Sequence, residues 1–151
     1  MAEKLKNAKI DLGLTPSLDR CRKTLNCVLV YHPKTIIVLE NLLLERDYGD
    51  LTGKSKIKLN EKDPLLTAKY RRAFDFPPPN GESLKEVKEK RIWPFCQRLE
   101  EKIKKEKINI AVSCTNNTMR LIRMYFEKLS IEEMEALENP LAQDFCSYGI
   151  S

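Results

Sequence analysis

The sequence predicts an α/β fold in which a mostly parallel sheet is flanked by helices on both faces, giving three layers. Short runs of apolar and β-branched residues alternate with longer segments whose apolar residues recur every three or four positions. Such alternation is typical of parallel strands joined by crossover helices. The chain has 151 residues, of which 42% are hydrophobic, so it can bury one core of ordinary size. We therefore expect residues 1–151 to form a single domain.

The first half of the chain contains two expected strands and one expected helix. Residues 10–14 (IDLGL) and the β-branched run at 35–39 (TIIVL) predict strands. Residues 18–30 place apolar side chains on one face, which predicts an amphipathic helix with Ser17 as its N-cap. Residues 45–80 are polar and contain the turn sequence PPPNG, so we expect a long excursion with short helices there.

A long amphipathic helix is expected over residues 82–106. Its apolar stripe consists of Leu84, Val87, Ile92, Phe95, Leu99 and Ile103. Pro94 lies inside this stripe, and because proline lacks an N–H group we expect it to kink or break the helix.

The last third of the chain predicts a buried strand followed by two helices. Residues 107–113 (KINIAVS) predict the strand and residues 118–128 a helix after a turn. Ser130 and Glu133 have the spacing of a capping box, which predicts a short helix after Ser130. Residues 144–150 are expected to form an edge strand. In parallel sheets ligands bind at the carboxyl ends of strands, so we look for a site in the turns that follow the first and last of these strands.

The charge balance and the cysteines restrict the function classes. There are 27 basic and 22 acidic residues, a formal net charge of +5, which suits small phosphorylated ligands. The basic segment at 85–107 interleaves acidic residues and carries no aromatic platform, so we expect no nucleic-acid binding. The five cysteines form no Cys-x-x-Cys pair, and we expect no metal site and no disulfide. We expect no membrane association and a cytoplasmic location, because the start is no signal peptide and no apolar run reaches about 18 residues.

Four segments carry motifs that occur together in one family. They are SLDRCRKTL at 17–25, LLLERDYGDLTGKSK at 42–56, KYRRAFDFPPPNGESL at 69–84 and NIAVSCTNNTMR at 109–120. In this order they resemble the cofactor-dependent phosphoglycerate mutases of the histidine phosphatase superfamily. The resemblance implies the fold of that family without its usual first strand, which lies near the middle of the parallel sheet. The neighbouring strands would then re-pair, or another segment or chain would fill the gap.

The resemblance also implies roles for individual residues. Arg20 would hold the transferring phosphoryl group, and Glu45 would be the general acid/base. The implied substrate-binding residues are Tyr48, Lys56, Arg71, Arg72 and Asn117. The residue types fit, because phosphoryl transfer depends on positioning and charge, and arginine binds phosphate and carboxylate oxygens bidentately.

The implied ligand is a phosphoglycerate, and the implied activity is the glycolytic interconversion of 2- and 3-phosphoglycerate. The family uses 2,3-bisphosphoglycerate as phosphoryl primer, and we expect no cofactor bound in the chain itself. The resemblance is also compatible with a homodimer.

Both histidines on which the family's chemistry depends are missing from the matching positions. The family opens with a strand ending in arginine-histidine-glycine, which this sequence lacks, and its one histidine, His32, matches no catalytic position. Thr115 and Asn116 stand where the second histidine and a glycine are expected. We therefore expect a degenerate mutase, catalytically impaired, that keeps a phosphate-binding pocket.

Three alternatives of other classes remain open. The chain could be part of an active mutase that another segment completes. Cys114 and Arg120 have the spacing of cysteine-dependent phosphatases, although their loop contains no glycine. The chain could also be a non-enzymatic interaction protein whose open sheet edge accepts a partner strand.

Overall fold

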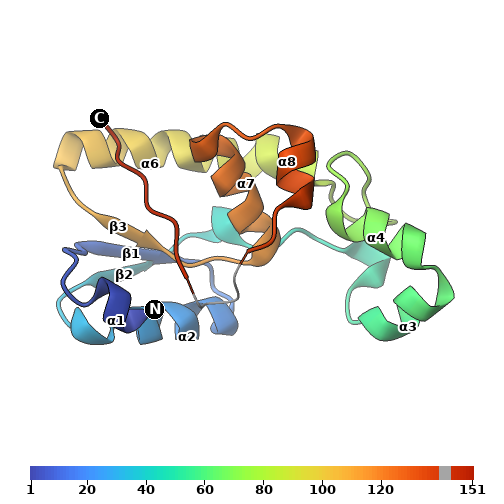
Figure 1. The fold of residues 1–151 in the computed structure, drawn as a ribbon, viewed down its shortest axis with the longest axis horizontal. Coiled ribbons are helices and arrows are strands. Elements are labelled where there is room, and N and C mark those ends of the chain that lie inside the picture. Colours follow the sequence, from blue (N-terminus) through green and yellow to red (C-terminus); the bar gives the residue numbers. More distant parts are fainter. Residues whose placement is uncertain (140–143) are drawn as a thin grey trace.

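A computed structural model describes residues 1–139 and 144–151 and has the expected three layers (Figure 1). Its strands are β1 (Leu12–Thr15), β2 (Ile36–Leu39) and β3 (Ile110–Val112). Its α-helices are α1 (Ala2–Leu5), α2 (Asp19–Val28), α3 (Lys56–Lys62), α4 (Pro64–Arg72), α5 (Leu84–Val87), α6 (Trp93–Glu106), α7 (Asn116–Glu127) and α8 (Ile131–Ala136). Short 3₁₀ turns cover Leu29–Tyr31, Asn41–Leu43 and Gly49–Leu51, and a π-helical turn, η4, covers Lys88–Ile92. The predicted α/β fold is confirmed.

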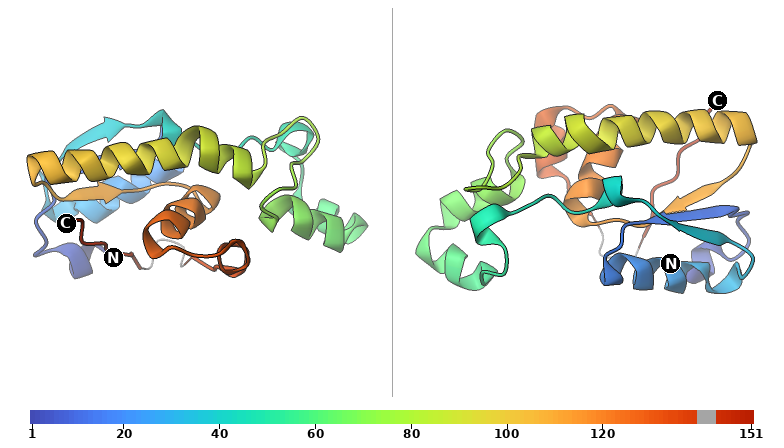
Figure 2. Two further views of the ribbon diagram at one scale, coloured as in Figure 1. Left: turned by 90° about the horizontal axis from the view of Figure 1, so that it is seen from above. Right: turned by 180° about the vertical axis from the view of Figure 1, so that it is seen from behind.

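The three strands form one parallel sheet in the order β2-β1-β3. Leu12 of β1 lies opposite Ile36 on one side and Ile110 on the other. The central strand β1 thus pairs directly with both neighbours, and the described sheet has no gap between β1 and β3. Helix α2 lies on one face and α6 on the other (Figures 1 and 2).

Helix α2 packs closely against β1 because Gly13 has no side chain. A Cβ at Gly13 would lie 3.1 Å from Leu25 Cδ2 and 3.2 Å from Leu29 Cδ1. The predicted N-cap, Ser17, is wrong. The chain stays extended through Leu18, so Leu18 occupies the cap position and the helix begins at Asp19 without a side-chain cap.

The long helix predicted over residues 82–106 is present, but a π turn interrupts it. Its start is fixed by a capping box between Ser83 and Glu86. The apolar stripe steps by five residues between Val87 and Ile92, and both side chains are buried because η4 accommodates the extra residue. Pro94 then lies in the first turn of α6, where its missing N–H group is tolerated. The helix is therefore interrupted by a π turn that ends just before Pro94, and not by a break at Pro94 itself.

The excursion after β2 forms the two short helices α3 and α4. Asp63 caps α4 by accepting a hydrogen bond of 2.9 Å from the Leu66 amide, and Pro64 occupies the first turn. The pair α3–α4 projects away from the sheet (Figure 1). The predicted excursion with short helices is confirmed.

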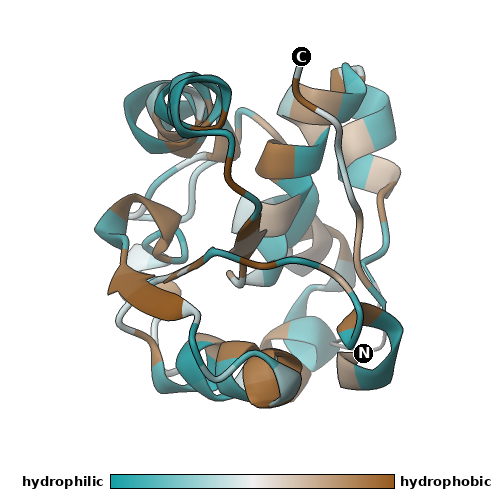
Figure 3. Cartoon of the chain, turned by 90° about the vertical axis from the view of Figure 1, so that its left-hand side faces the viewer, coloured by the Kyte–Doolittle hydropathy of each residue, from teal (hydrophilic) through white to brown (hydrophobic). Residues whose placement is uncertain are grey.

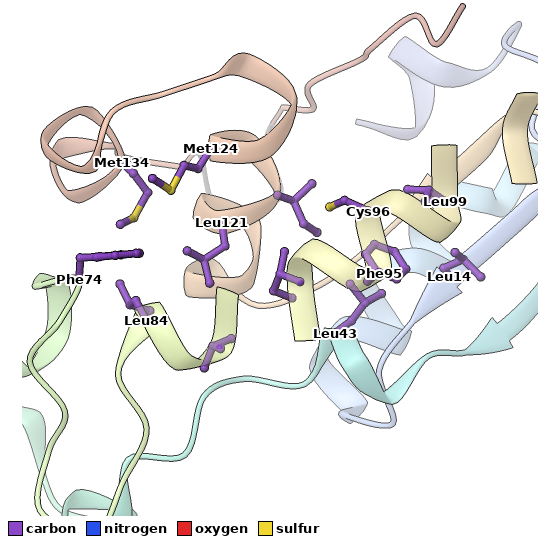
Figure 4. Packing of buried hydrophobic residues seen from close by; sticks show 13 residues of the cluster. Leu14, Leu43, Phe74, Leu84, Phe95, Cys96, Leu99, Leu121, Met124 and Met134 are labelled. Carbon is purple, nitrogen blue, oxygen red and sulfur yellow. The ribbon is translucent and has the colours of Figure 1, made fainter. Parts of the chain in front are cut away.

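The core cluster extends from Leu14 on β1 along α6 and α7 to α5 and α8 (Figure 4). Its buried residues are Leu14, Leu43, Phe74, Leu84, Val87, Ile92, Phe95, Cys96, Leu99, Leu121, Ile122, Met124 and Met134. The capping box predicted at Ser130 and Glu133 is present and starts α8, which places Met134 in this core.

The C-terminal tail is not a strand, and this prediction is wrong. Side-chain contacts, and not the backbone hydrogen bonds of a sheet, hold the tail against the rest of the molecule. The Tyr148 ring stacks on the Phe126 ring, with ring centroids 5.0 Å apart. The Tyr148 hydroxyl donates to Glu127 at 2.6 Å, and Lys4 pairs with Asp144 at 3.0 Å. In the part of the chain that the structure describes, no helix has the length and apolar character to cross a membrane.

Candidate phosphate-binding site

A cavity of about 530 Å³ opens where the chain leaves the carboxyl ends of the strands. It is lined by Leu18, Arg20, Leu44, Glu45, Asp47, Glu82 and Arg91. Arg20 lies in the first turn of α2, directly after β1, and Glu45 follows the 3₁₀ turn after β2. The turns after two parallel strands therefore supply a cation and a carboxylate to one cavity.

A hydrogen-bonded group joins α7 to the segment that carries Glu45. The Asn117 side-chain amide donates to Glu45 Oε1 at 3.2 Å and to the Tyr48 hydroxyl oxygen at 2.8 Å. Asn117 lies in the first turn of α7 and is buried. The structure thus brings together three of the residues selected from the sequence, although 69 and 72 positions separate Asn117 from the other two.

The segment around Tyr48 is fixed from behind by a buried arginine and by a close backbone approach. The Arg46 guanidinium lies 4.6 Å from the centroid of the Tyr48 ring and is almost fully buried. Gly49 has a φ of 51°, and a Cβ there would collide with the Pro79 carbonyl. Only glycine fits this position, so the PPPNG loop holds the Tyr48 turn in place.

Arginines form a second group on the Tyr48 side of the site. Arg72 donates to the Glu135 carbonyl at 3.3 Å and pairs with Glu138. Burial, reinforced by the nearby charge of Arg72, lowers the pKa of Arg120, and Tyr48 and Arg71 also act on it electrostatically. Glu138 already balances part of the positive charge of this cluster, since it pairs with Arg72 and also acts electrostatically on Arg120.

Lys56 stands apart from these two groups. It is the first residue of α3 and is exposed, on the helix pair that projects from the sheet (Figure 1). Among the described residues no hydrogen bond or ion pair joins its side chain to Glu45, Tyr48 or Asn117. The role implied for Lys56 therefore stays a prediction.

Thr115 and His32 occupy structural positions. Thr115 is the N-cap residue of α7, and its buried hydroxyl donates to Thr118 Oγ1 at 3.1 Å. His32 follows the carboxyl-terminal end of α2, where its Nε2 lies 2.9 Å from the Leu5 carbonyl oxygen. Arg20 lies at the opposite end of that helix, so His32 is separated from the cavity by the length of α2.

The structure argues against Cys114 and Arg120 as the nucleophile and the phosphate-binding arginine of a cysteine-dependent phosphatase. Burial raises the pKa of the Cys114 thiol, and Glu45 adds to this effect, whereas a nucleophilic cysteine needs a lowered pKa. Arg120 Nε donates to the Leu137 carbonyl at 3.0 Å, which directs this group toward the segment after α8. The described residues also contain no group of three or more His, Cys, Asp or Glu side chains that could hold a metal ion.

The sequence profile of the histidine phosphatase superfamily (branch 1) matches residues 1–146. The chain belongs to the histidine phosphatase superfamily. Relatives in this superfamily include the 2,3-bisphosphoglycerate-dependent phosphoglycerate mutase of Parvibaculum lavamentivorans, which is 38% identical over 141 residues. That match covers 90% of this chain and 66% of the relative. The mutase of Rhizobium johnstonii is 35% identical over 137 residues, which cover 85% of this chain and 62% of the relative. The chain thus spans less than two thirds of the length of these mutases.

Solved structures of several phosphatases share the fold at lower identity. A mycobacterial glucosyl-3-phosphoglycerate phosphatase in complex with inorganic phosphate matches with a TM-score of 0.73 at 16% identity, over 91% of this chain and 68% of that one. The α-ribazole phosphatase of Shigella flexneri matches with a TM-score of 0.67 at 22% identity, over 88% and 66% of the two chains. At this identity the likeness supports the fold alone.

Several residues of the cavity wall were not selected from the sequence. Arg91 and Glu82 form an ion pair of 2.8 Å there, and Asp47 lies beside them. One local signal pointed to Arg91: it falls within the five-residue step of the apolar stripe, where a regular helix would leave a charged residue near the core. Glu82 gave no such signal, because an acidic residue before a helix is ordinary.

Proposed function

We propose that this histidine phosphatase family member binds a small phosphorylated carboxylic acid of the phosphoglycerate type and turns it over slowly or not at all. The carrying observation is the hydrogen-bonded group of Glu45, Asn117 and Tyr48 beside a cavity that Arg20 also lines. Arginine supplies charge to a phosphate, and the amide and hydroxyl groups supply fixed polar contacts.

The proposed impairment rests on Thr115, which stands at the place of the family's second histidine. The resemblance assigns the chemistry to a phosphohistidine, and the one histidine of the sequence is held at the far end of α2. Thr115, at the second histidine's place, carries no charge and has its hydroxyl bonded to Thr118. With threonine in place of the second histidine, the residues of this site can bind a phosphoryl group but lack the imidazole that would act beside a phosphohistidine.

Thermal unfolding with and without millimolar 3-phosphoglycerate tests the binding. A ligand at about 100 times its dissociation constant stabilises a protein by about 2.7 kcal/mol, which corresponds to a rise of roughly 5–10 °C in Tm for a chain of this size. Arg20→Ala should abolish the rise. Arg22→Ala is the matched control, because Arg22 is exposed on the same helix but does not line the cavity. An unshifted Tm in the unmodified protein would contradict the proposal.

A mutase assay primed with 2,3-bisphosphoglycerate tests the impairment separately. We expect turnover indistinguishable from a blank. Clear turnover that Glu45→Gln removes would overturn the impairment while leaving the proposed ligand class intact.

A further inference from the structure

Arg91 and Glu82 form an ion pair, and their side chains hydrogen-bond to the backbone at both ends of the turn that carries Glu45. We propose that Arg91 and Glu82 are positioning residues, which act through the backbone to hold Glu45 and Tyr48 in the geometry that Asn117 requires. This inference rests on the proposed function, because it assigns how the same site is kept in shape.

Arg91 holds the amino-terminal side of this turn. Its Nη1 donates to the Leu44 carbonyl at 3.1 Å, immediately before Glu45. The hydroxyl of Thr118 donates to the same carbonyl at 3.2 Å. Since Thr118 follows Asn117 on α7, one carbonyl group ties the Glu45 turn both to η4 and to the helix that supplies the amide.

Glu82 holds the carboxyl-terminal side. Its Oε2 accepts a hydrogen bond of 2.8 Å from the Asp47 amide, and its own backbone N–H donates to the Asp47 carbonyl at 2.9 Å. The same Oε2 accepts from Arg91 Nη2 at 2.8 Å. The two side chains therefore form one bridge that spans the turn from Leu44 to Asp47.

The burial of the pair argues against stabilisation as its main role. The side chains of Arg91 and Glu82 are only 17% and 29% exposed, and Arg91 Nε has no partner among the described residues. A partly shielded ion pair recovers only part of its desolvation cost, so the attraction between the two charges by itself adds little to stability. What apolar side chains could not do in its place is hold the Leu44 carbonyl and the Asp47 amide at the same time.

The π turn explains how Arg91 reaches this place. Ile92 is fully buried in the core, and its neighbour Arg91 lines the cavity. The wider turn of η4 lets Val87 and Ile92 both face the core despite their five-residue spacing. The helix thus keeps its apolar stripe while it presents a guanidinium group to the Glu45 turn, and π turns often occur at functional positions.

The test compares Arg91→Met with Lys90→Met. Methionine keeps an unbranched side chain and removes the charge in both cases. Lys90 is the matched control, because it lies next to Arg91 in η4 but makes an exposed ion pair with Glu86, at 65% and 42% exposure. The measurements are the dissociation constant for 3-phosphoglycerate, Tm, and the NMR resonances of the Asn117 side-chain amide.

We expect Arg91→Met to weaken binding at least tenfold and to shift both amide proton resonances of Asn117, with Arg91→Lys intermediate. Glu82→Gln should act in the same direction, because it removes the charge that holds Arg91. Lys90→Met should change the dissociation constant less than twofold and leave the Asn117 resonances in place.

Two outcomes separate this inference from the proposed function. If Arg91→Met lowers Tm but leaves the affinity and the Asn117 resonances unchanged, the pair is only structural and the inference fails. If the unmodified protein binds no phosphorylated ligand, the proposed function fails, and the Asn117 resonances still decide whether Arg91 positions the turn.

Discussion

The two outer strands of the sheet, β2 and β3, are similar in sequence and opposite in environment. Both are short, apolar and paired in parallel with β1. Ile110 and Val112 of β3 are partly buried and pack against the core cluster. All four residues of β2 are exposed, between 41% and 67%, and the hydropathy colouring in Figure 3 shows such a strongly apolar strand at the edge of the molecule.

The difference comes from the helices rather than from the strands. Helices α6 and α7 contribute Leu99 and Leu121 to the core cluster against which β3 packs, whereas the side chains of β2 are exposed. An apolar strand sequence therefore indicates that a segment pairs in a sheet. Whether helices then shield that strand from solvent depends on elements far away in the sequence. The covered strand β3 and the exposed strand β2 should therefore differ in how their surroundings respond to substitution.

The largest effect is expected from Leu121→Ala on the covered side. Leu121 is fully buried, so the substitution removes transfer free energy and leaves a cavity, which should lower the free energy of unfolding by about 2–5 kcal/mol. Urea unfolding followed by circular dichroism measures this loss. A cost below about 1 kcal/mol would mean that the α6–α7 layer is loosely packed.

A smaller effect is expected from alkaline pH, again on the covered side. Burial raises the pKa of the Cys96 thiol to about 12, from 9.0 in the unfolded chain. Because the thiol ionises more readily when unfolded, its contribution is complete below pH 9 and is lost as the pH rises toward 12. The free energy of unfolding should fall by about 1.4 kcal/mol from this group by pH 10.

Unfolding between pH 7 and 10 in the presence of a reductant checks the sign and slope. Cys96→Ala should flatten the alkaline loss, even though it lowers stability at neutral pH. Cys27→Ala is the control, because Cys27 is exposed. Equal slopes in the two variants would place the ionising group elsewhere.

The smallest effect is expected from Ile36→Thr in β2. Ile36 is 67% exposed, and threonine keeps the β-branched shape, so the free energy of unfolding should change by no more than about 0.5 kcal/mol. The same urea titration measures it. A loss above about 2 kcal/mol would show that β2 is covered in solution.

Sedimentation at several protein concentrations provides the second check on β2. Because the apolar side chains of β2 are exposed to solvent, we expect weak, concentration-dependent self-association. Val38→Lys should suppress this association, since a charged edge strand resists pairing. A stable dimer that Val38→Lys leaves intact would place the contact elsewhere and remove β2 from the explanation.

Local sequence patterns predicted the regular helices and strands well and the departures from regular structure less well. The apolar periodicity of α2 and the Ser130–Glu133 spacing each described an interaction between residues a few positions apart, and both are present. The tail after residue 144 failed because its apolar residues pack as single side chains, such as Tyr148 on Phe126, which no strand pattern distinguishes from an edge strand.

The site was less predictable from residue patterns than the fold. The selection of Glu45, Tyr48 and Asn117 came from the resemblance, and their contact depends on α7 meeting a turn 69 or more positions earlier. Arg91 was not selected because the five-residue step of the apolar stripe marks only its unusual position, and its backbone partner, the Leu44 carbonyl, leaves no mark in the sequence.

The amide of Asn117 fixes the direction in which protons point at this site. The nitrogen of the amide faces Glu45, and the same nitrogen also donates to the Tyr48 oxygen. Both amide hydrogens are then committed. The phenolic hydrogen of Tyr48 is left pointing away from Asn117, so this hydroxyl can donate to a further acceptor on its other side.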